Sequence, residues 1–461
     1  MVGNPEINEA TNEVKLIFSV QPGNRTYTRK ILFTGNDITQ DYVLRREMRQ
    51  FEGAWTSDNS IEAGKVRLER LGYFKEVNVE TIPVPGTEDQ IDIVYSVEEE
   101  TTGSVGGNIG YSDFGLMLGF NLQEQNFLGS GNTVGIGINK NIYSEMYNIS
   151  YMNPYATRDA VSLGYNVFFR ETDYGEFNVA NYLTNSNGFG AQFGYPISDI
   201  SRLGFNITYD KTDIDIGTLP AREIYDFVSV EGNIFETLTA QLSWQQVTLN
   251  RGLFPTDGAS TVVSFSSTIP GSDLSYYRFN IRQRYYQPLS SDFVFGFQGE
   301  IGYLDSYGDT EEIPFFQNFY AGGPRSLRGF ESNTLGPRST DAPCYEFNYE
   351  EGTCPNLIDT DGDGEADAPY LNPYANQGQR SRYRDAPIGG NIKVEGSLQL
   401  IFRLPFIEDQ RSLRSAFFFD FGNVFSDNCK EYQINCSELS FDELRYSYGV
   451  GVTWITGFGP M

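Results

Sequence analysis

Apolar and polar positions alternate with a period of two along most of the chain beyond Thr101. In Val161–Phe169 the residues Val, Leu, Tyr, Val and Phe occupy one face, and Ser, Gly and Asn occupy most of the other. Ser104–Tyr111 and Phe293–Tyr303 repeat this alternation. Because successive side chains of a strand point to opposite faces, each segment has one apolar face and one small or polar face. The pattern predicts a mainly β fold, a transmembrane antiparallel β-barrel with lipid outside and a polar interior.

A soluble antiparallel sandwich would alternate too, with its large residues pointing into a core between two sheets. Here the second face carries small and charged residues, and the sequence offers no further apolar face to cover the first one. The membrane barrel is therefore the favoured fold class.

Turn signals between the alternating segments divide residues 100–461 into about 14 predicted strands. These begin near residues 103, 115, 131, 146, 160, 187, 201, 237, 260, 275, 292, 390, 413 and 446. One connection, residues 305–389, is far longer than an ordinary loop, and such loops are usually functional.

Residues 24–99 have a different pattern, which predicts a small α+β domain with one sheet face free. Before this domain, residues 1–23 contain one strand-like run, Val14–Val20, which has no partner of its own and is interpreted as the tail of a preceding domain. Within 24–99 we expect a strand over Tyr27–Thr34, a helix capped by Thr39 and reaching about Phe51, a helix capped by Ser57 and reaching Leu71, and strands around Val77–Val79 and Ile91–Val97.

Composition narrows the functional classes. The chain has 461 residues, 15% of them aromatic, with mean hydropathy −0.38 and no long apolar run, so no transmembrane helix is expected. A net charge of −28 argues against binding nucleic acid. The absence of His excludes Ser-His-Asp and Cys-His catalysis and most zinc sites. Because no phosphate-binding loop or readable nucleophile is present either, we expect no catalytic residue, metal or cofactor, and no enzyme.

Four cysteines fall in two local pairs, Cys344 with Cys354 and Cys429 with Cys436. Each pair lies in a loop-like segment, which is typical of loop disulfides in the periplasm or at the cell surface. A zinc site with four cysteine ligands is the alternative. It would require the two loops to meet, and neither pair has the close Cys-x-x-Cys spacing.

The long connection contains a Gly-Gly-Pro tripeptide followed by Arg328-Gly329-Phe330, which predicts a sharply folded loop tip. Alternation places Glu395 and Asp420 on the inward faces of the next two strands. An acid among the aromatic residues of Phe417–Phe421 is costly unless its face is polar and paired. We predict that Arg328 pairs with Asp420 and pins the loop inside the barrel, with Glu395 or Lys393 nearby. An Asp420 that is merely solvated in a wide lumen is the alternative.

Asp359–Asp367 copies the first half of a calcium-binding loop, with alternating oxygen ligands and a Gly at the sixth position. The twelfth position is Tyr370 rather than a bidentate Glu, and no flanking helices are evident. We interpret the segment as a solvated acidic loop tip, with weak Ca²⁺ binding at the surface as the alternative.

Four further segments are specific when taken together: Leu44–Trp55, Phe254–Gly258, Ile269–Asp273, and Phe319–Gly323 leading into Arg328-Gly329-Phe330. In these segments the chain closely resembles the BamA family, the central subunits of the β-barrel assembly machinery in Gram-negative outer membranes. The resemblance covers essentially the whole chain. It implies that residues 24–99 are the membrane-proximal POTRA domain, residues 1–23 the end of the preceding POTRA domain, and residues 100–461 a barrel of the 16-stranded type.

The resemblance also implies a function. A protein of this family inserts and folds β-barrel clients in the bacterial outer membrane without ATP, with its POTRA domains in the periplasm. A client strand would add to the edge of the first barrel strand at a lateral seam. The expected partners are unfolded outer-membrane proteins, the lipid bilayer and accessory Bam lipoproteins. The residues that match are Arg328, Gly329, Phe330 and Asp420 for a loop latch, Glu52 for contact with a BamD-like lipoprotein, and Gly103, Val105, Gly107, Ile109 and Tyr111 for the client-strand edge.

Two departures from the family pattern matter. Gln399 stands where relatives carry a glutamate, so the latch is expected to use Glu395 or Asp420 alone. The chain stops in a predicted turn, Gly457–Met461, where family members continue; the last two strands are therefore expected to be missing. A two-partner-type polypeptide secretion pore, which has the same architecture, is the alternative function. A passive porin leaves the N-terminal domain unexplained.

Overall fold

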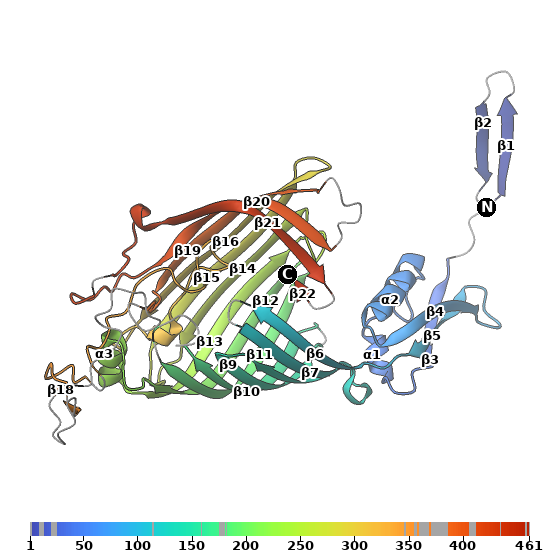
Figure 1. Cartoon of the computed structure of the whole chain (residues 1–461). Coiled ribbons are helices and arrows are strands. Elements are labelled where there is room, and N and C mark those ends of the chain that lie inside the picture. The colour runs from blue at the N-terminus through green and yellow to red at the C-terminus, as the bar shows by residue number, and fades with distance from the viewer. Residues whose placement is uncertain are drawn as a thin grey trace. The chain divides into compact units, whose positions relative to one another are not determined.

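The computed structural model describes residues 2–8, 13–19, 25–112, 115–157, 159–174, 180, 182–344, 347–354, 357–358, 368–369, 386–404, 412–433, 435–456 and 459–460. The chain separates into two compact units, one of residues 1–103 with 124–132 and the other of residues 104–123 with 133–461 (Figure 1). None of the helices within the described ranges is long and apolar enough to cross a membrane.

The first unit contains a three-stranded sheet of order β3-β5-β4. Strand β3 (Tyr27–Thr34) runs parallel to β5 (Gln90–Glu99), which pairs antiparallel with β4 (Phe74–Pro83). Helix α1 (Asp41–Arg45) and helix α2 (Asp58–Arg70) bury their apolar side chains in the same cluster as one face of the sheet. The members of this core with the least exposure are Val43, Leu44, Leu68, Ile93 and Tyr95. The period of 3.6 in α2 and the period of two in β5 place these residues together.

The prediction of a helix from Thr39 to Phe51 is wrong. Helix α1 ends at Arg45, and Gln40 precedes it without a side-chain cap. Beyond Arg45 the backbone forms short-range turns, while the Gln50 side chain donates to the carbonyl oxygen of Trp55 and accepts from the amide of Ser57. These bonds bend the segment toward α2. The Ser57 cap is confirmed, since its hydroxyl oxygen accepts from the Ser60 amide.

The prediction that the run Val14–Val20 has no partner is also wrong. Strand β2 (Glu13–Ser19) pairs antiparallel with β1 (Val2–Asn8) in a two-stranded sheet. Strand β1 has little β-branched or aromatic character and contains Pro5, so its sequence gives a weak strand signal.

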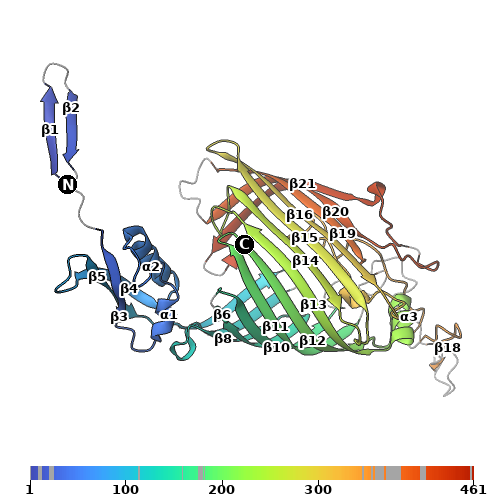
Figure 2. The ribbon, with the colours of Figure 1, turned by 180° about the vertical axis from the view of Figure 1, so that it is seen from behind.

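The second unit contains a 15-stranded sheet in which sequence neighbours pair antiparallel. Fourteen of its strands begin within a few residues of the predicted positions, and the fifteenth, β22 (Gly459–Pro460), lies within the predicted turn Gly457–Met461 and pairs with the end of β21. The order runs from β22 to β6, and no pairing joins these two ends within the described chain, so the sheet is not closed (Figures 1 and 2). The long strands are β6 (Gly103–Ser112), β7 (Gly115–Glu124), β8 (Thr133–Lys140), β9 (Ser144–Asn153), β10 (Ser162–Asp173), β11 (Leu183–Ser198), β12 (Ser201–Asp215), β13 (Ile234–Val247), β14 (Gly258–Thr268), β15 (Tyr276–Pro288), β16 (Phe293–Ser306), β19 (Ile392–Phe402), β20 (Leu413–Phe425) and β21 (Arg445–Thr456).

The two faces of this sheet differ as the alternation predicts. Large apolar side chains are exposed at every second position, for example Tyr165, Val167 and Phe169 on β10 and Phe417 and Phe419 on β20. A soluble protein rarely exposes so large an apolar surface, whereas a membrane barrel requires it.

The apolar core of the second unit lies at one end of the sheet, where the long connection between β16 and β19 packs against helix α3 (Arg222–Glu231). Phe227 of α3 meets Phe315 of the short helix η3 (Phe315–Gln317) edge to face at 5.2 Å. Leu327 of the loop tip, 1% exposed, belongs to the same cluster. Further along, the connection contains β17 (Leu357–Ile358) and β18 (Ala368–Pro369); the candidate calcium loop Asp359–Asp367 lies outside the described residues.

Candidate functional site: a loop tip bound to the inner face of the sheet

Two glycines shape the loop tip. Gly322 and Gly323 have φ values of +106° and +100°, which favour glycine. A Cβ on Gly322 would lie 2.4 Å from the carbonyl oxygen of Glu331, and one on Gly323 would lie 2.2 Å from Oγ of Ser332. The Gly323 amide donates to the carbonyl oxygen of Phe330 at 3.1 Å. The chain therefore folds back on itself between Gly323 and Phe330, and the residues between these two form the loop tip.

Arg328 lies between them and contacts Asp420 of β20 through three hydrogen bonds. Its Nε donates to Oδ2 at 2.7 Å, its Nη2 to Oδ1 at 2.6 Å, and its backbone amide to Oδ2 at 3.1 Å. The Asp420 side chain is 0% exposed and that of Arg328 is 25% exposed. A bidentate pair with both carboxylate oxygens used is the strongest geometry for such a contact, and burial raises the penalty for breaking it.

Two neighbouring side chains complete the surroundings of the guanidinium. Its Nη2 also donates to Oγ of Ser397 at 2.8 Å, and its Cζ lies 3.6 Å from the ring centroid of Phe418. Ser397 is the register partner of Asp420 on β19, so the sheet holds both acceptors side by side. The aromatic face adds a cation–π contact.

A second contact joins the tip to the sheet. The Ser326 hydroxyl donates to Glu395 of β19. Glu395 is the direct cross-strand partner of Glu300 on β16, an unfavourable arrangement of like charges. Lys393 relieves it, since its Nζ lies 3.3 Å from Oε2 of Glu300 and 3.2 Å from Oε1 of Glu395, and Arg282 contributes a further bond to Glu300 at 3.1 Å.

The remaining residues of the predicted latch have smaller roles in the geometry. Gly329 adopts φ +87°, and a Cβ there would lie 3.5 Å from Cβ of Ser447 on β21. Phe330 is half-buried against the apolar core of the unit. Gln399 donates to Ser397 at 3.2 Å, and Glu395 contacts the loop through Ser326. Alternation places Ser397 and Glu300 on polar faces of their strands, but it does not predict their contacts with Arg328 and Lys393, and it gives no signal for Ser326 in the loop.

The predicted client-strand edge is the terminal strand β6 of the sheet. Val105, Ile109 and Tyr111 are 71%, 66% and 85% exposed and share a face with Gly103 and Gly107. Because glycine has no side chain to pack against neighbouring strands, Gly103 and Gly107 weaken the attachment of β6 to the sheet.

Glu52, the predicted contact for a lipoprotein, lies in the first unit. One carboxylate oxygen accepts from the Ile31 amide at 2.8 Å and from Nη1 of Arg45 at 3.1 Å, and the side chain is 45% exposed. The hydrogen bond from Ile31, and then the Arg45 guanidinium, outweigh partial desolvation and lower the pKa of Glu52.

The four cysteines form two disulfides, Cys344–Cys354 and Cys429–Cys436, so the alternative of a four-cysteine zinc site is wrong. The second disulfide closes a short segment between β20 and β21. Within it, Nζ of Lys430 lies 2.6 Å from Oε1 of Glu312, on the long connection, and the Tyr432 hydroxyl donates to Asp226 of α3 at 2.7 Å.

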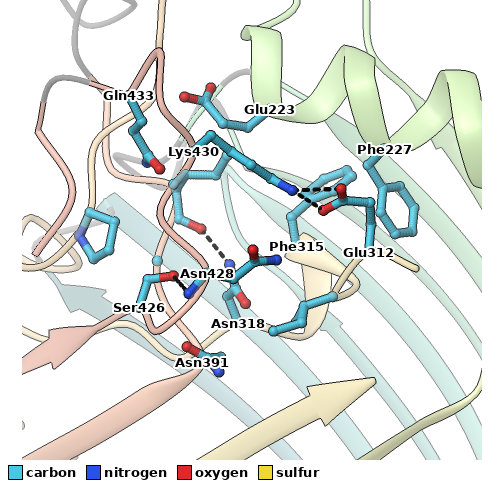
Figure 3. A pocket seen from close by; sticks show the side chains of 14 residues that line it. Glu223, Phe227, Glu312, Phe315, Asn318, Asn391, Ser426, Asn428, Lys430 and Gln433 are labelled. Carbon is cyan, nitrogen blue, oxygen red and sulfur yellow. Dashed lines mark hydrogen bonds and ion pairs between the residues drawn. The ribbon is translucent and has the colours of Figure 1, made fainter. Parts of the chain in front are cut away.

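The segment Cys429–Cys436, with its Lys430–Glu312 and Tyr432–Asp226 contacts, is called the clasp below. Figure 3 shows a small polar cavity of about 70 Å³ beside the clasp, with the Lys430–Glu312 pair on its wall. Glu223 of α3 also lines it and accepts from the hydroxyl and amide of Thr340; burial nevertheless raises the pKa of Glu223. Its lining comes from α3, the long connection and the 426–433 segment, so the cavity marks where three loop regions meet at the end of the sheet.

Two features define the class of protein. One is a membrane-type β-sheet that holds an inserted loop, and the other is a small α+β domain in the same chain. Residues 126–461 match the Omp85 superfamily domain, and residues 26–100 match the POTRA family, described as a surface antigen variable number repeat. The chain belongs to the Omp85 superfamily. It is an outer-membrane β-barrel protein with a periplasmic POTRA domain.

Within this superfamily the chain is similar to BamA proteins. It is 30% identical to the outer membrane protein assembly factor BamA of Neisseria meningitidis over 99% of this chain and 56% of that protein. The crystal structure of BamA from Haemophilus ducreyi lacking POTRA domains 1–3 matches with a TM-score of 0.80 and 30% identity, covering 100% of this chain and 84% of that one. CdiB from Escherichia coli, at 12% identity and a TM-score of 0.52, shares the fold. The chain spans about half the length of the curated BamA relatives that it matches, 56% in Neisseria and 40% in Buchnera aphidicola.

Proposed function

We propose that this protein is an outer-membrane insertase that folds and inserts β-barrel client proteins. The single observation that carries the proposal is that β6 is the first strand of the barrel sheet and lies at one end of its strand order, with no partner on its outer edge among the described residues. A strand with one unpaired edge presents a row of backbone donors and acceptors to another chain. The similarity to assembly factors named BamA supports the same function.

The mechanism is β-augmentation on β6 without ATP. A client strand pairs with the edge of β6 through main-chain hydrogen bonds, which supply affinity with little demand on the client's side chains. The free energy comes from the client's own folding and lipid contact, so the protein is not an enzyme in the usual sense. Residues 24–99 form the membrane-proximal POTRA domain, residues 1–23 the end of the one before it, and residues 100–461 the barrel with the inserted loop 305–389.

The loop tip acts as a latch in this account. Arg328, supported by Gly329 and Phe330, holds the long connection on the inner face through Asp420, and Glu395 assists through Ser326. Because the latch contacts β19 and β20 and Gly329 lies beside β21, it stabilises the strands on the far side of the seam from β6. Accessory Bam lipoproteins are the proposed partners, with a BamD-like protein at Glu52.

The test uses the full-length protein reconstituted in liposomes with a urea-denatured small barrel protein, whose folding is followed by its heat-modifiable gel shift. We expect faster folding than in empty liposomes. Unchanged client folding together with a steady large ion conductance would instead favour a polypeptide secretion pore.

A further inference from the structure

The inner face of β15 carries three arginines, Arg278, Arg282 and Arg284. The first is covered by the long connection, because its Nη1 donates to the carbonyl oxygen of Gln317 at 3.3 Å and its Cζ lies 4.1 Å from the ring centroid of Phe319. This contact identifies the face as the one that meets the inserted loop. Side chains separated by an even number of residues share a face of a strand, so Arg282 and Arg284 lie on it too, further along β15.

The strand register extends this basic face to β12. Arg202 of β12 is opposite Gln245 of β13, Gln245 is opposite Val262 of β14, and Val262 is opposite Arg282 of β15. Directly opposed residues of an antiparallel sheet point to the same face. Because neighbouring strands lie about 4.8 Å apart, the backbones at Arg202 and Arg282 are separated by about 14 Å along one row of the inner face. Arg202, Arg282 and Arg284 are called the arginine wall below.

The arginine wall has few carboxylates to balance it. Nη2 of Arg282 lies 3.1 Å from Oε1 of Glu300, yet the Arg282 side chain remains 66% exposed. The guanidinium of Arg284 has one long hydrogen bond, to Oγ of Ser260 at 3.5 Å. Arg202 and Arg284 are both exposed, and neither has a carboxylate partner among the described residues. Two of the three charges are therefore available to a ligand.

The basic character continues at Arg414 of β20. Its Cζ lies 4.8 Å from the ring centroid of Tyr286, which is the next residue after Arg284 on the same face of β15. Its Nη2 donates to the carbonyl oxygen of Pro255 at 2.9 Å, and its Nε is buried without a hydrogen-bond partner in the part of the chain that the structure describes. The whole chain has 61 acidic and only 33 basic residues, so this accumulation of arginines runs against its composition.

We propose that the arginine wall binds acidic side chains of an extended client segment on the inner face of the sheet. A guanidinium recognises a carboxylate through two parallel hydrogen bonds. Side chains on one face of an extended chain recur about every 6.6 Å, which is also the spacing between Arg282 and Arg284 along β15. Acidic residues at alternate positions of a client strand therefore match the wall. That the ligand is a client rests on the proposed function; the charge and the spacing stand on the contacts above.

The test measures binding of two labelled peptides to the full-length protein in lipid nanodiscs by fluorescence anisotropy. The acidic peptide alternates Glu with Thr, and the neutral peptide has Gln in place of every Glu. We expect the wild-type protein to bind the acidic peptide more tightly. Arg202→Gln combined with Arg284→Gln should weaken binding of the acidic peptide about three- to tenfold and leave that of the neutral peptide unchanged. The matched control is Arg49→Gln combined with Arg70→Gln, which removes the same charge from exposed positions outside the sheet.

Arg202→Lys combined with Arg284→Lys is the conservative variant and should retain most of the affinity, since it keeps both charges. Heat-modifiable mobility verifies that each variant is folded, and Arg202→Gln alone serves if the double variant is not. Equal affinity of the wild-type protein for the two peptides, or an equal loss in the control variant, would overturn the proposal. Client folding is measured in parallel: a wild-type protein that fails to accelerate it contradicts the proposed function, whereas the peptide affinities test the arginine wall independently.

Discussion

Arg328 reaches Asp420 across 92 residues of sequence, and the carboxylate that receives its three hydrogen bonds is fully buried in the wall of the sheet. The contact joins the tip of the long connection between β16 and β19 to β20, the third strand from the C-terminal end of the sheet. Loss of either side chain would leave the other charge without its partner in a buried site, and this makes the contact costly to break.

Removing either partner should therefore be more harmful than removing both. Arg328→Ala leaves Asp420 uncompensated and should destabilise the barrel by about 3 kcal/mol, as measured for buried pairs broken on one side. Arg328→Ala combined with Asp420→Ala should recover part of that loss. Heat-modifiability of the reconstituted protein across a temperature series provides the measurement. Additive effects of the two substitutions would contradict the pairing.

Lys393 is predicted to matter because it separates two facing acids. Lys393→Met leaves Glu300 and Glu395 opposite each other on adjacent strands, and should destabilise the barrel by about 1–3 kcal/mol. Adding Glu395→Gln to Lys393→Met should restore much of this stability, while Lys393→Arg should have little effect. The same heat-modifiability series is used. A neutral Lys393→Met variant would show that water in the lumen screens the two carboxylates.

The disulfide Cys429–Cys436 is predicted to hold the clasp at the loop end of the sheet. Replacing both cysteines by serine should loosen the segment that carries Lys430 and Tyr432 and increase its cleavage by external protease severalfold. Lys430→Met should act in the same direction, since it removes the pair with Glu312. The Cys344→Ser/Cys354→Ser protein is the matched control. Equal cleavage of all four proteins would show that the clasp does not depend on these contacts.

Glu52 should give the POTRA domain an acid-dependent stability. Because the pKa of Glu52 is lowered in the folded state, its contribution is complete above the unfolded value of about 4.3 and is lost as the pH falls through the lower folded value. Urea denaturation followed by amide exchange in α2 should show this loss below about pH 4. Glu52→Gln should lack that part of the pH dependence. An unchanged profile in this variant would mean that the Ile31 and Arg45 bonds do not contribute to stability.

The sequence predicted the parts of the molecule in which one physical rule dominates. Alternation of apolar and small residues, as in β10, was sufficient to place the long strands, because lipid and lumen impose opposite preferences on neighbouring positions. The cost of an acid among aromatic residues singled out Asp420.

Other features depend on contacts between distant segments and gave no such signal. Helix α3 is short and lies in a loop, and the attachment of Glu395 to Ser326 rests on one hydroxyl. Helix α1 ends at Arg45, and the Gln50 side chain that bonds Trp55 and Ser57 beyond it makes contacts that no helical period predicts. Strand β1 forms only through pairing with β2.

The most direct test of the account is disulfide capture of a folding client on β6. Single cysteines replace Val105 or Ile109 of β6 in the full-length protein, with Leu242→Cys of β13, a 54% exposed position on a central strand, as the control. The client carries one cysteine in its terminal strand and is stalled during insertion. We expect captured products with the β6 cysteines, whose yield alternates with a period of two as the client cysteine is moved, and none with Leu242→Cys. Efficient client folding without capture on β6 would contradict it.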